Sequence, residues 1–387
     1  MSEQVGKQSL QFSNPPYVLS CSSVVGTREG KGPLRDQFDV VSEDDHFDSE
    51  NWETAESMLQ KKALKIALDK AAVLPEELRY LFAGDLLGQS VATSFGLQEF
   101  QVPLIGLYGA CSTSGLSLSL AAMTVAAGYA DLAAAVTSSH FASAEKQFRF
   151  PLEYANQRPL CTTWTVTGSG AFLLAGGGKY LDLKRRNHHE KIFAEDPDDL
   201  AFKDWNNSRD IVISGVTTGK ILDYGVRDSM NMGAAMAPAA MDVIRAHFED
   251  FGRTPEDYDW IVTGDLGQVG KQILIELLME KGIDISANHT DCGIEIFDNE
   301  KQKTGSGGSG CGCSAVTLAA HFLPMLRSGE IRRLLFVPTG ALLSKISFNE
   351  GKNVPGIAHA VVLESRIFGQ QENGRPEKRN QNKEAKK

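Results

Sequence analysis

The 387-residue sequence repeats one order of elements in its two halves. LRYLFAGDLLGQ at 78–89 matches YDWIVTGDLGQ at 258–268, and each segment contains an apolar strand, Gly-Asp-Leu, Gly-Gln and the start of a helix. GACSTSGLSLSLAAMTVAAGYADLAAAVTSS at 109–139 parallels GCGCSAVTLAAHFLPMLRSGEIRRLLFVPTG at 310–340. In both, small residues open a helix, Gly128 or Gly329 ends it, and an apolar strand follows. Two matched units in the same order predict an internally duplicated α/β chain.

Hydrophobic periodicity divides the rest of the chain around these units. A strand is expected at 16–25, and apolar residues at helical spacing predict a helix over 51–73. A charge-rich stretch separates the two halves, and the last residues are basic with almost nothing apolar. We therefore expect four parts: a first half at 16–182, a charged insertion or linker at 183–210, a second half at 211–366 and a disordered tail at 367–387.

Composition excludes several classes of function. The net charge of −10 is opposite to that of a nucleic-acid-binding surface, so we expect no nucleic-acid partner. The N-terminal MSEQVGKQSL lacks the apolar core of a signal peptide. The longest apolar stretch, 116–136, is interrupted by polar residues, which predicts a buried helix and strand rather than a membrane span. Six cysteines without an export signal indicate free thiols in a reducing compartment.

Cys111 is the first candidate for chemistry. It follows a short apolar segment and precedes an Ala-rich helix, among small residues that let a ligand approach the backbone. A thiol at a helix N-terminus has its thiolate favoured by unpaired N–H groups and the helix dipole. The alternative is a buried cysteine that packs as a small apolar side chain.

The Gly-Ala-Cys-Ser turn inside this duplicated plan resembles the nucleophile region of thiolases and ketoacyl synthases. Within that superfamily, the sequence is most similar to the stage V sporulation protein AD family of endospore formers. The resemblance covers about residues 16–366 and implies an α/β, thiolase-like, five-layered αβαβα fold made of two similar halves. The segments that carry it are VVGTREGKGPL at 24–34, AGDLLGQ at 83–89, YGACSTS at 108–114, VTSSHF at 136–141, GVRDSMNMGAAMAPAAMD at 225–242, VTGDLGQVG at 262–270, GSGGSGCGCSA at 305–315 and PGIAHAV at 355–361.

The resemblance also implies a degenerate active site. Condensing enzymes of this superfamily pair the cysteine with a His and with a second His or an Asn. Here the first of these positions holds Asp265, and the second lies in Gly310-Cys311. Because a carboxylate repels the negative charge that develops during acyl transfer, we expect a non-catalytic protein. An acyltransferase that uses Cys111 as the acyl-accepting nucleophile is the alternative.

For the ligand, the resemblance implies dipicolinic acid (pyridine-2,6-dicarboxylic acid), which is taken up into the developing spore. No cofactor is expected, although Ca²⁺ could enter with this ligand. Asp85 and Asp265 could instead cap the helices that follow them, and each histidine could be an internally paired residue. A zinc set of His289, Cys292, Cys311 and Cys313 has an unusual Cys-x-Cys spacing, so no metal site is expected. The expected ligand-binding residues are Asp85, Cys111, Ser112, His140, Asp265, Gly356 and His359.

The expected partners follow from the same resemblance. They are the other stage V sporulation membrane channel proteins, which would hold the chain at the cytoplasmic side of the spore inner membrane. A purely structural role in that complex is a third possibility. Relatives with this fold are commonly dimers through the first half, so a homodimer is expected.

Overall fold

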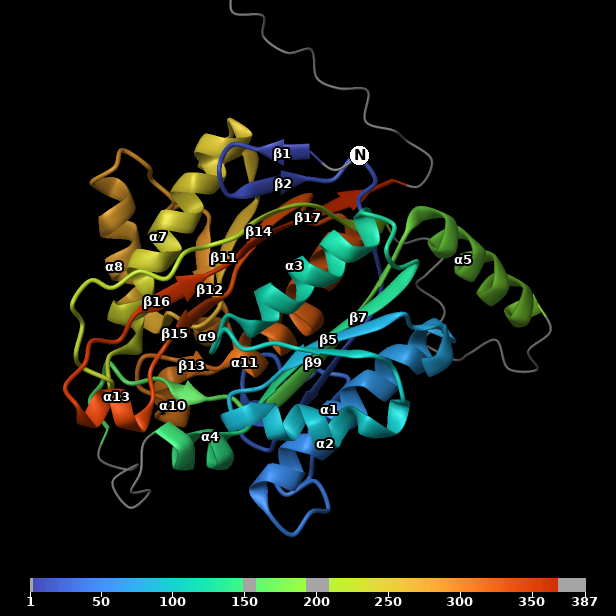
Figure 1. Ribbon diagram of the computed structural model, residues 1–387. Coiled ribbons are helices and arrows are strands. Elements are labelled where there is room, and N and C mark those ends of the chain that lie inside the picture. Colours follow the sequence, from blue (N-terminus) through green and yellow to red (C-terminus); the bar gives the residue numbers. More distant parts are fainter. Residues whose placement is uncertain (1–2, 149–157, 193–208, 368–387) are drawn as a thin grey trace, which may run out of the picture.

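The computed structural model describes residues 3–148, 158–192 and 209–367. The main sheet has the strand order β12-β11-β14-β17-β10-β3-β9-β7-β5-β6 (Figure 1). β10 and β3 pair at a single position, so two five-stranded sheets meet edge to edge. The strands of the first are β3 (Tyr17–Val25), β5 (Tyr80–Gly84), β6 (Leu104–Gly106), β7 (Leu132–Ser139) and β9 (Gly168–Ala175). Those of the second are β10 (Asp210–Thr217), β11 (Trp260–Thr263), β12 (His289–Asp291), β14 (Arg333–Val337) and β17 (Ala360–Arg366).

The two sheets have the same topology, as the duplication predicts. β6, β5 and β7 are parallel to one another, and β9 and β3 follow in antiparallel order. In the second sheet, β12, β11 and β14 are parallel, and β17 and β10 follow in antiparallel order. The carboxyl ends of β5 and β11 therefore occupy equivalent places, which is where α/β sheets usually bind ligands.

Helices lie between the sheets and outside each of them (Figure 1). The buried helices α3 (Thr113–Ala126) and α11 (Cys311–Thr317) form the middle layer, where the Ser114 and Ser314 hydroxyls are 2.6 Å apart. α1 (Trp52–Ala71) and α2 (Val91–Leu97) cover the first sheet. α7 (Met232–Phe251) and α8 (Gly267–Met279) cover the second. The expected thiolase-like αβαβα fold is confirmed.

Local sequence explains why the repeat folds twice. α1 and α7 both begin after an asparagine whose side chain accepts a backbone N–H, and both end at a residue in the left-handed conformation, Ala72 or Gly252. A short turn opening with Pro75 or Pro255 then leads into β5 or β11. The helix, the turn and the strand of the second half each begin 180 residues (255 minus 75 for the turn) after their counterparts in the first half. The same offset relates Gly84-Asp85 to Gly264-Asp265.

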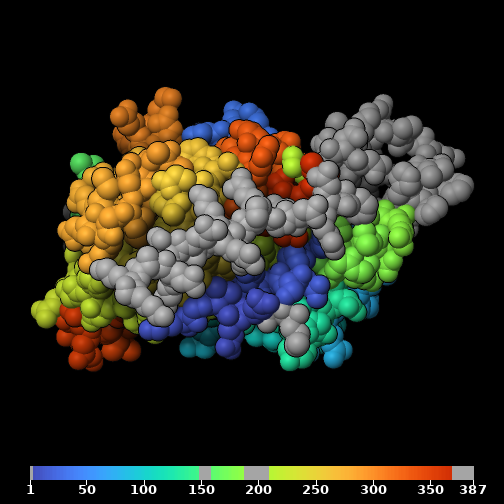
Figure 2. Space-filling model, turned by 90° about the horizontal axis from the view of Figure 1, so that it is seen from above, coloured from blue at the N-terminus to red at the C-terminus, as the bar shows by residue number. Residues whose placement is uncertain are grey.

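Two boundaries differ from the expected ones. The first half was expected to begin at residue 16, but β1 (Glu3–Val5) and β2 (Ser9–Gln11) form a hairpin whose β2 pairs with β10 of the second half. Figure 2 shows this hairpin, in dark blue, at the surface beside the second half.

The expected insertion begins inside a helix, α5 (Gly177–Ile192). The charged residues of α5 did not prevent helix formation, because Tyr180 and Leu183 form an apolar face of this helix that packs in the core. Residues 193–208 of that segment and 368–387 of the expected tail lie outside the described residues.

Candidate functional site

The turn before α3 places Cys111 between the two halves. Ala110 adopts a left-handed backbone conformation with φ of 50°, which is costly for a residue with a Cβ and is typical of functional sites. Gly340 packs against this turn, since a Cβ there would lie 2.4 Å from the carbonyl oxygen of Gly109. The amides of Ser112 and Thr113 donate to the carbonyl oxygens of Gly109 and Ala110, so they are not the unpaired N–H groups that were expected at the start of this helix.

The Cys111 thiol is buried and lies beside Asp265 and Cys311. Burial raises the pKa of the thiol well above its usual range, and the Asp265 carboxyl and Cys311 raise it further. The structure thus brings together the nucleophile position and its two expected partner positions. The environment favours the neutral thiol rather than an activated thiolate.

Asp265 is a site residue rather than a helix cap. One carboxylate oxygen accepts from the Thr339 hydroxyl at 2.8 Å, and the other accepts from the Gly310 amide at 2.9 Å. Burial raises the pKa of Asp265 to about 7, and hydrogen bonds from Gly310, Cys111 and Thr339 oppose that rise. The carboxyl group therefore joins three segments around Cys111 and offers no donor to an oxyanion.

Asp85, at the equivalent position of the first half, has the capping role that was left open. One oxygen accepts from the Leu87 amide, and the other accepts from the amide and hydroxyl of Thr93 at the start of α2, all within 2.8 Å. Both oxygens are thus engaged locally. The same Gly-Asp-Leu sequence serves different purposes in the two halves.

The two candidate histidines lie away from the cavity at Cys111. The Nε2 of His140 pairs with the carbonyl oxygen of Asp45 at 2.7 Å, and its Nδ1 lies 3.1 Å from the amide of Ala142. An amide can only donate, so Nδ1 is the acceptor and the ring is neutral. His359 is buried with no partner for Nε2 among the described residues, and burial lowers its pKa to about 4. Neither ring lines the cavity at Cys111.

Ser112 and Gly356 are engaged elsewhere. The Ser112 hydroxyl donates to the carbonyl oxygen of Gly109 at 2.7 Å. The amide of Gly356, expected as a donor near the nucleophile, instead donates to the carbonyl oxygen of Leu222 at 2.8 Å. Its lack of a side chain is explained by packing, because a Cβ there would lie 2.5 Å from the carbonyl oxygen of Ala235.

A narrow cavity of about 20 Å³ adjoins Cys111, enough for roughly one water molecule. Its wall contains a buried carboxylate that sequence reasoning missed, Glu145, which lies 2.9 Å from the Arg158 guanidinium and accepts from the Thr165 hydroxyl. No local motif marks Glu145, because folding alone brings α4 (Phe141–Phe148) to Cys111. The cavity is lined by Leu86, Ala110, Cys111, Ala144, Glu145, Thr165, Met232, Ser309, Ala341 and Leu343.

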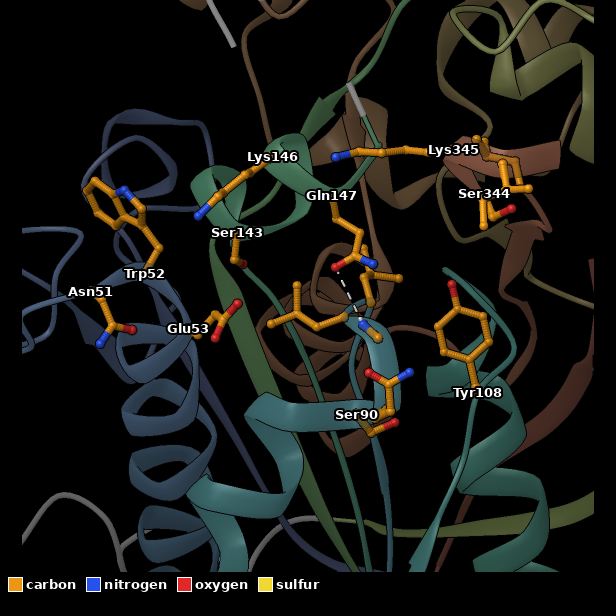
Figure 3. Close-up of a pocket in the computed structure, with 16 residues that line it drawn as sticks. Asn51, Trp52, Glu53, Ser90, Tyr108, Ser143, Lys146, Gln147, Ser344 and Lys345 are labelled. Atoms are coloured by element: carbon orange, nitrogen blue, oxygen red, sulfur yellow. Dashed lines mark hydrogen bonds between the residues drawn. The ribbon is translucent and has the colours of Figure 1, made fainter. Parts of the chain in front are cut away.

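A larger pocket of about 840 Å³ opens outside this cavity (Figure 3). Leu86 and Leu343 belong to the walls of both, so these two side chains separate the outer pocket from Cys111. The pocket wall comes from the start of α1, the loop 86–90, α4 and the segment 343–346. The outer pocket therefore lies between the two halves.

Across residues 3–148, 158–192 and 209–367, no group of three or more His, Cys, Asp or Glu side chains is placed to hold a metal ion. In the suggested zinc set, the thiols of Cys311 and Cys313 donate to the carbonyl oxygens of Ser138 and Gly264. Within the same ranges, no helix is long and apolar enough to cross a membrane.

Fold and site together define a thiolase-like protein. Solved structures of similar fold include the tetronic acid condensing enzyme AbyA1 (TM-score 0.52, 18% identity, covering 90% of this chain and 99% of that one). Another is a variant of OleA from Xanthomonas campestris (TM-score 0.52, 14% identity, 91% and 99% covered). At these identities the likeness concerns the fold alone.

Sequence comparison is more specific. Residues 6–364 match the stage V sporulation protein AD family. The stage V sporulation protein AD of Bacillus subtilis (strain 168) is 39% identical over 359 residues, which cover 93% of this chain and 97% of that protein. The chain belongs to the stage V sporulation protein AD family.

Proposed function

We propose that this sporulation protein binds dipicolinic acid beside Cys111, together with Ca²⁺, and serves its uptake into the developing spore. The observation that carries the proposal is the carboxyl group of Asp265. It occupies the position that, by the resemblance, holds a proton-handling His in condensing enzymes. With its two oxygens accepting from Thr339 and Gly310, Asp265 does not supply the N–H donor for an oxyanion that a His would supply at this position. Binding, rather than acyl transfer, is what such a site supports.

The charges around the cavity favour Ca²⁺ as part of the ligand. Asp265 lies next to Cys111, whereas Glu145 in the cavity wall is already paired with Arg158, so a free dianion would meet the Asp265 carboxyl group there. Ca²⁺ takes about six to eight oxygen ligands, and carboxylates of ligand and protein can share it. Ca²⁺ would then arrive with dipicolinic acid rather than reside in the protein.

Ligand entry requires side chains to move. A cavity of about 20 Å³ holds roughly one water molecule and no aromatic ring. Leu86 and Leu343 close it on the side of the outer pocket, and Met232 and Ala144 also lie in its wall. We expect the bound form to differ in these apolar side chains rather than in the sheets, since rotamer changes are the common response to binding.

Calorimetry with dipicolinic acid in the presence of Ca²⁺ tests the proposal. The protein should bind, Cys111→Ala should weaken binding modestly, and Cys111→Leu should remove the tight binding because its larger side chain fills the cavity. Isophthalic acid, which lacks the ring nitrogen, should bind more weakly. Cys161→Leu, at a half-buried thiol away from the cavity, is the matched control. Equal affinity of Cys111→Leu and the unmodified protein would place the ligand elsewhere and refute the proposal.

The alternative is acyl transfer by Cys111, which is favoured by the left-handed Ala110 turn that presents the thiol at the start of α3. Incubation with acetyl-CoA followed by intact-mass measurement separates the two functions. An acyl adduct that is lost in Cys111→Ala would support the acyltransferase, and its absence is expected.

The proposal extends to partners and place. We propose that the chain acts at the cytoplasmic side of the spore inner membrane, held there by the other stage V sporulation membrane channel proteins. We also propose a homodimer through the first half. The edge strand β6 supports it, since its residues Leu104, Ile105 and Gly106 are all exposed and an open strand edge is a template for pairing.

A further inference from the structure

The outer pocket is lined by two lysines and one carboxylate, Glu53, whereas Glu145 in the wall of the inner cavity is paired with Arg158. Lys146 of α4 and Lys345, at the start of α13 (Lys345–Asn349), both line the pocket of about 840 Å³. We propose that these two lysines form a capture site that holds the free aromatic dicarboxylate before it meets Ca²⁺ and enters the cavity at Cys111. This inference rests on the proposed function and adds a second binding site to it.

The arrangement of the side chains supports capture of a flat dianion. In Figure 3, Lys345 extends across the pocket toward α4, and Lys146 extends from α4 toward Trp52. Tyr108 points into the pocket from below. Each lysine carries an ammonium point charge on a flexible stem that can meet a carboxylate, and the exposed Tyr108 ring offers a flat apolar face to an aromatic ring. Glu53 also lines this wall and offsets part of the positive charge.

The side chains that a ligand would meet change along the path from the outer pocket to Cys111. The two sites therefore differ in their need for Ca²⁺. From the outside, a ligand would meet the two lysines, then the apolar pair Leu86 and Leu343, and then Glu145 in the cavity wall. A dianion is attracted by the lysines without any cation, whereas at Cys111 it would lie beside the Asp265 carboxyl group, which Ca²⁺ could bridge. The volumes agree with this order, because only the outer pocket has room for the ring before side chains move.

Cys111→Leu isolates the outer site, because it removes tight binding at the inner one. In this variant, dipicolinate without Ca²⁺ should still bind weakly, as measured by ligand-observed NMR titration at low ionic strength. High ionic strength should weaken that binding, since exposed charges are screened. Adding Lys146→Gln or Lys345→Gln should weaken it by about 1.4-fold to fivefold each, the range expected for exposed charge pairs. Lys281→Gln, at an unrelated surface, is the control and should leave this binding unchanged. The double variant Lys146→Gln/Lys345→Gln should bind more weakly than this control.

The outcomes separate the inference from the proposed function. Suppose that the unmodified protein binds dipicolinic acid with Ca²⁺. If, in the Cys111→Leu protein, the double variant Lys146→Gln/Lys345→Gln then binds free dipicolinate as well as Lys281→Gln does, the capture site is refuted and the proposed function stands. If the unmodified protein binds dipicolinic acid neither with nor without Ca²⁺, the proposed function fails and the capture site fails with it. Salt-sensitive binding lost in the double lysine variant, with Lys281→Gln unchanged, supports the inference.

Discussion

Asp265 gives the site a charge that depends on pH. Burial raises its pKa to about 7 from an ordinary value of 3.8, so the folded protein holds this proton more tightly than the unfolded chain does. The contribution of this group to stability is therefore fully present below about pH 4 and is lost as the pH rises toward 7. Asn has the same size as Asp: its amide oxygen can accept from the Gly310 amide, and its amide nitrogen can donate to the Thr339 hydroxyl oxygen, which accepts in place of donating.

We therefore expect Asp265→Asn to flatten part of the pH dependence of unfolding. Relative to the unmodified protein, the variant should gain stability between about pH 4 and pH 7, by at most about 4 kcal/mol, because one pKa unit corresponds to about 1.4 kcal/mol. Urea unfolding at several pH values measures the difference. A difference that stays constant over this range would show that Asp265 does not titrate as inferred.

Among the elements, the close contact of β15 (Thr339–Ala341) with the turn before α3 joins the two halves at the site. Gly340→Ala should destabilise the protein by about 1–3 kcal/mol, since its Cβ would overlap the carbonyl oxygen of Gly109 and must push the Cys111 turn away. Denaturant unfolding measures the loss, and ligand affinity should fall with it. Gly106→Ala, where a Cβ would meet nothing within 4 Å in the isolated chain, is a matched control for stability.

The edge strand β6 tests the proposed dimer. Ile105→Lys should shift the protein from dimer to monomer in sedimentation equilibrium, because a charge on an exposed strand edge opposes pairing. Its far-ultraviolet circular dichroism should not change. Leu74→Lys introduces the same charge at a more exposed apolar residue and should leave the dimer intact. A protein that is monomeric without any substitution would contradict the proposal.

In the molecule as a whole, the N-terminal hairpin ties the chain's beginning to its second half. Asp250 of α7 accepts hydrogen bonds from the Lys7 and Gln8 amides and from the Ser9 hydroxyl, at 2.8–3.0 Å. We expect Asp250→Ala to destabilise the protein by about 1–3 kcal/mol, since three donors lose their acceptor. Thermal unfolding measures this effect. Glu249→Ala, which breaks only an exposed ion pair with Arg245, should cost much less.

Sequence by itself determined the architecture. Repeated strand and helix periods, together with Gly-Asp turns at 84–85 and 264–265, predicted two equivalent sheets, because local patterns set which elements form and which faces they bury. It also identified Cys111, Asp265 and Cys311 as neighbours, through resemblance to a known arrangement. The first prediction depends on patterns of residues close together in the chain, and the second depends on the resemblance.

Only the tertiary structure decided what each site residue does. Asp85 and Asp265 share the same local sequence, yet one caps α2 and the other joins Gly310, Thr339 and Cys111, because different segments approach them. His140 and Gly356 proved to be engaged by Asp45 and Leu222, which are distant in sequence. Glu145, Lys146 and Lys345 reached the site in the same way. Long-range packing chooses the partners of a polar group, and no local motif records that choice.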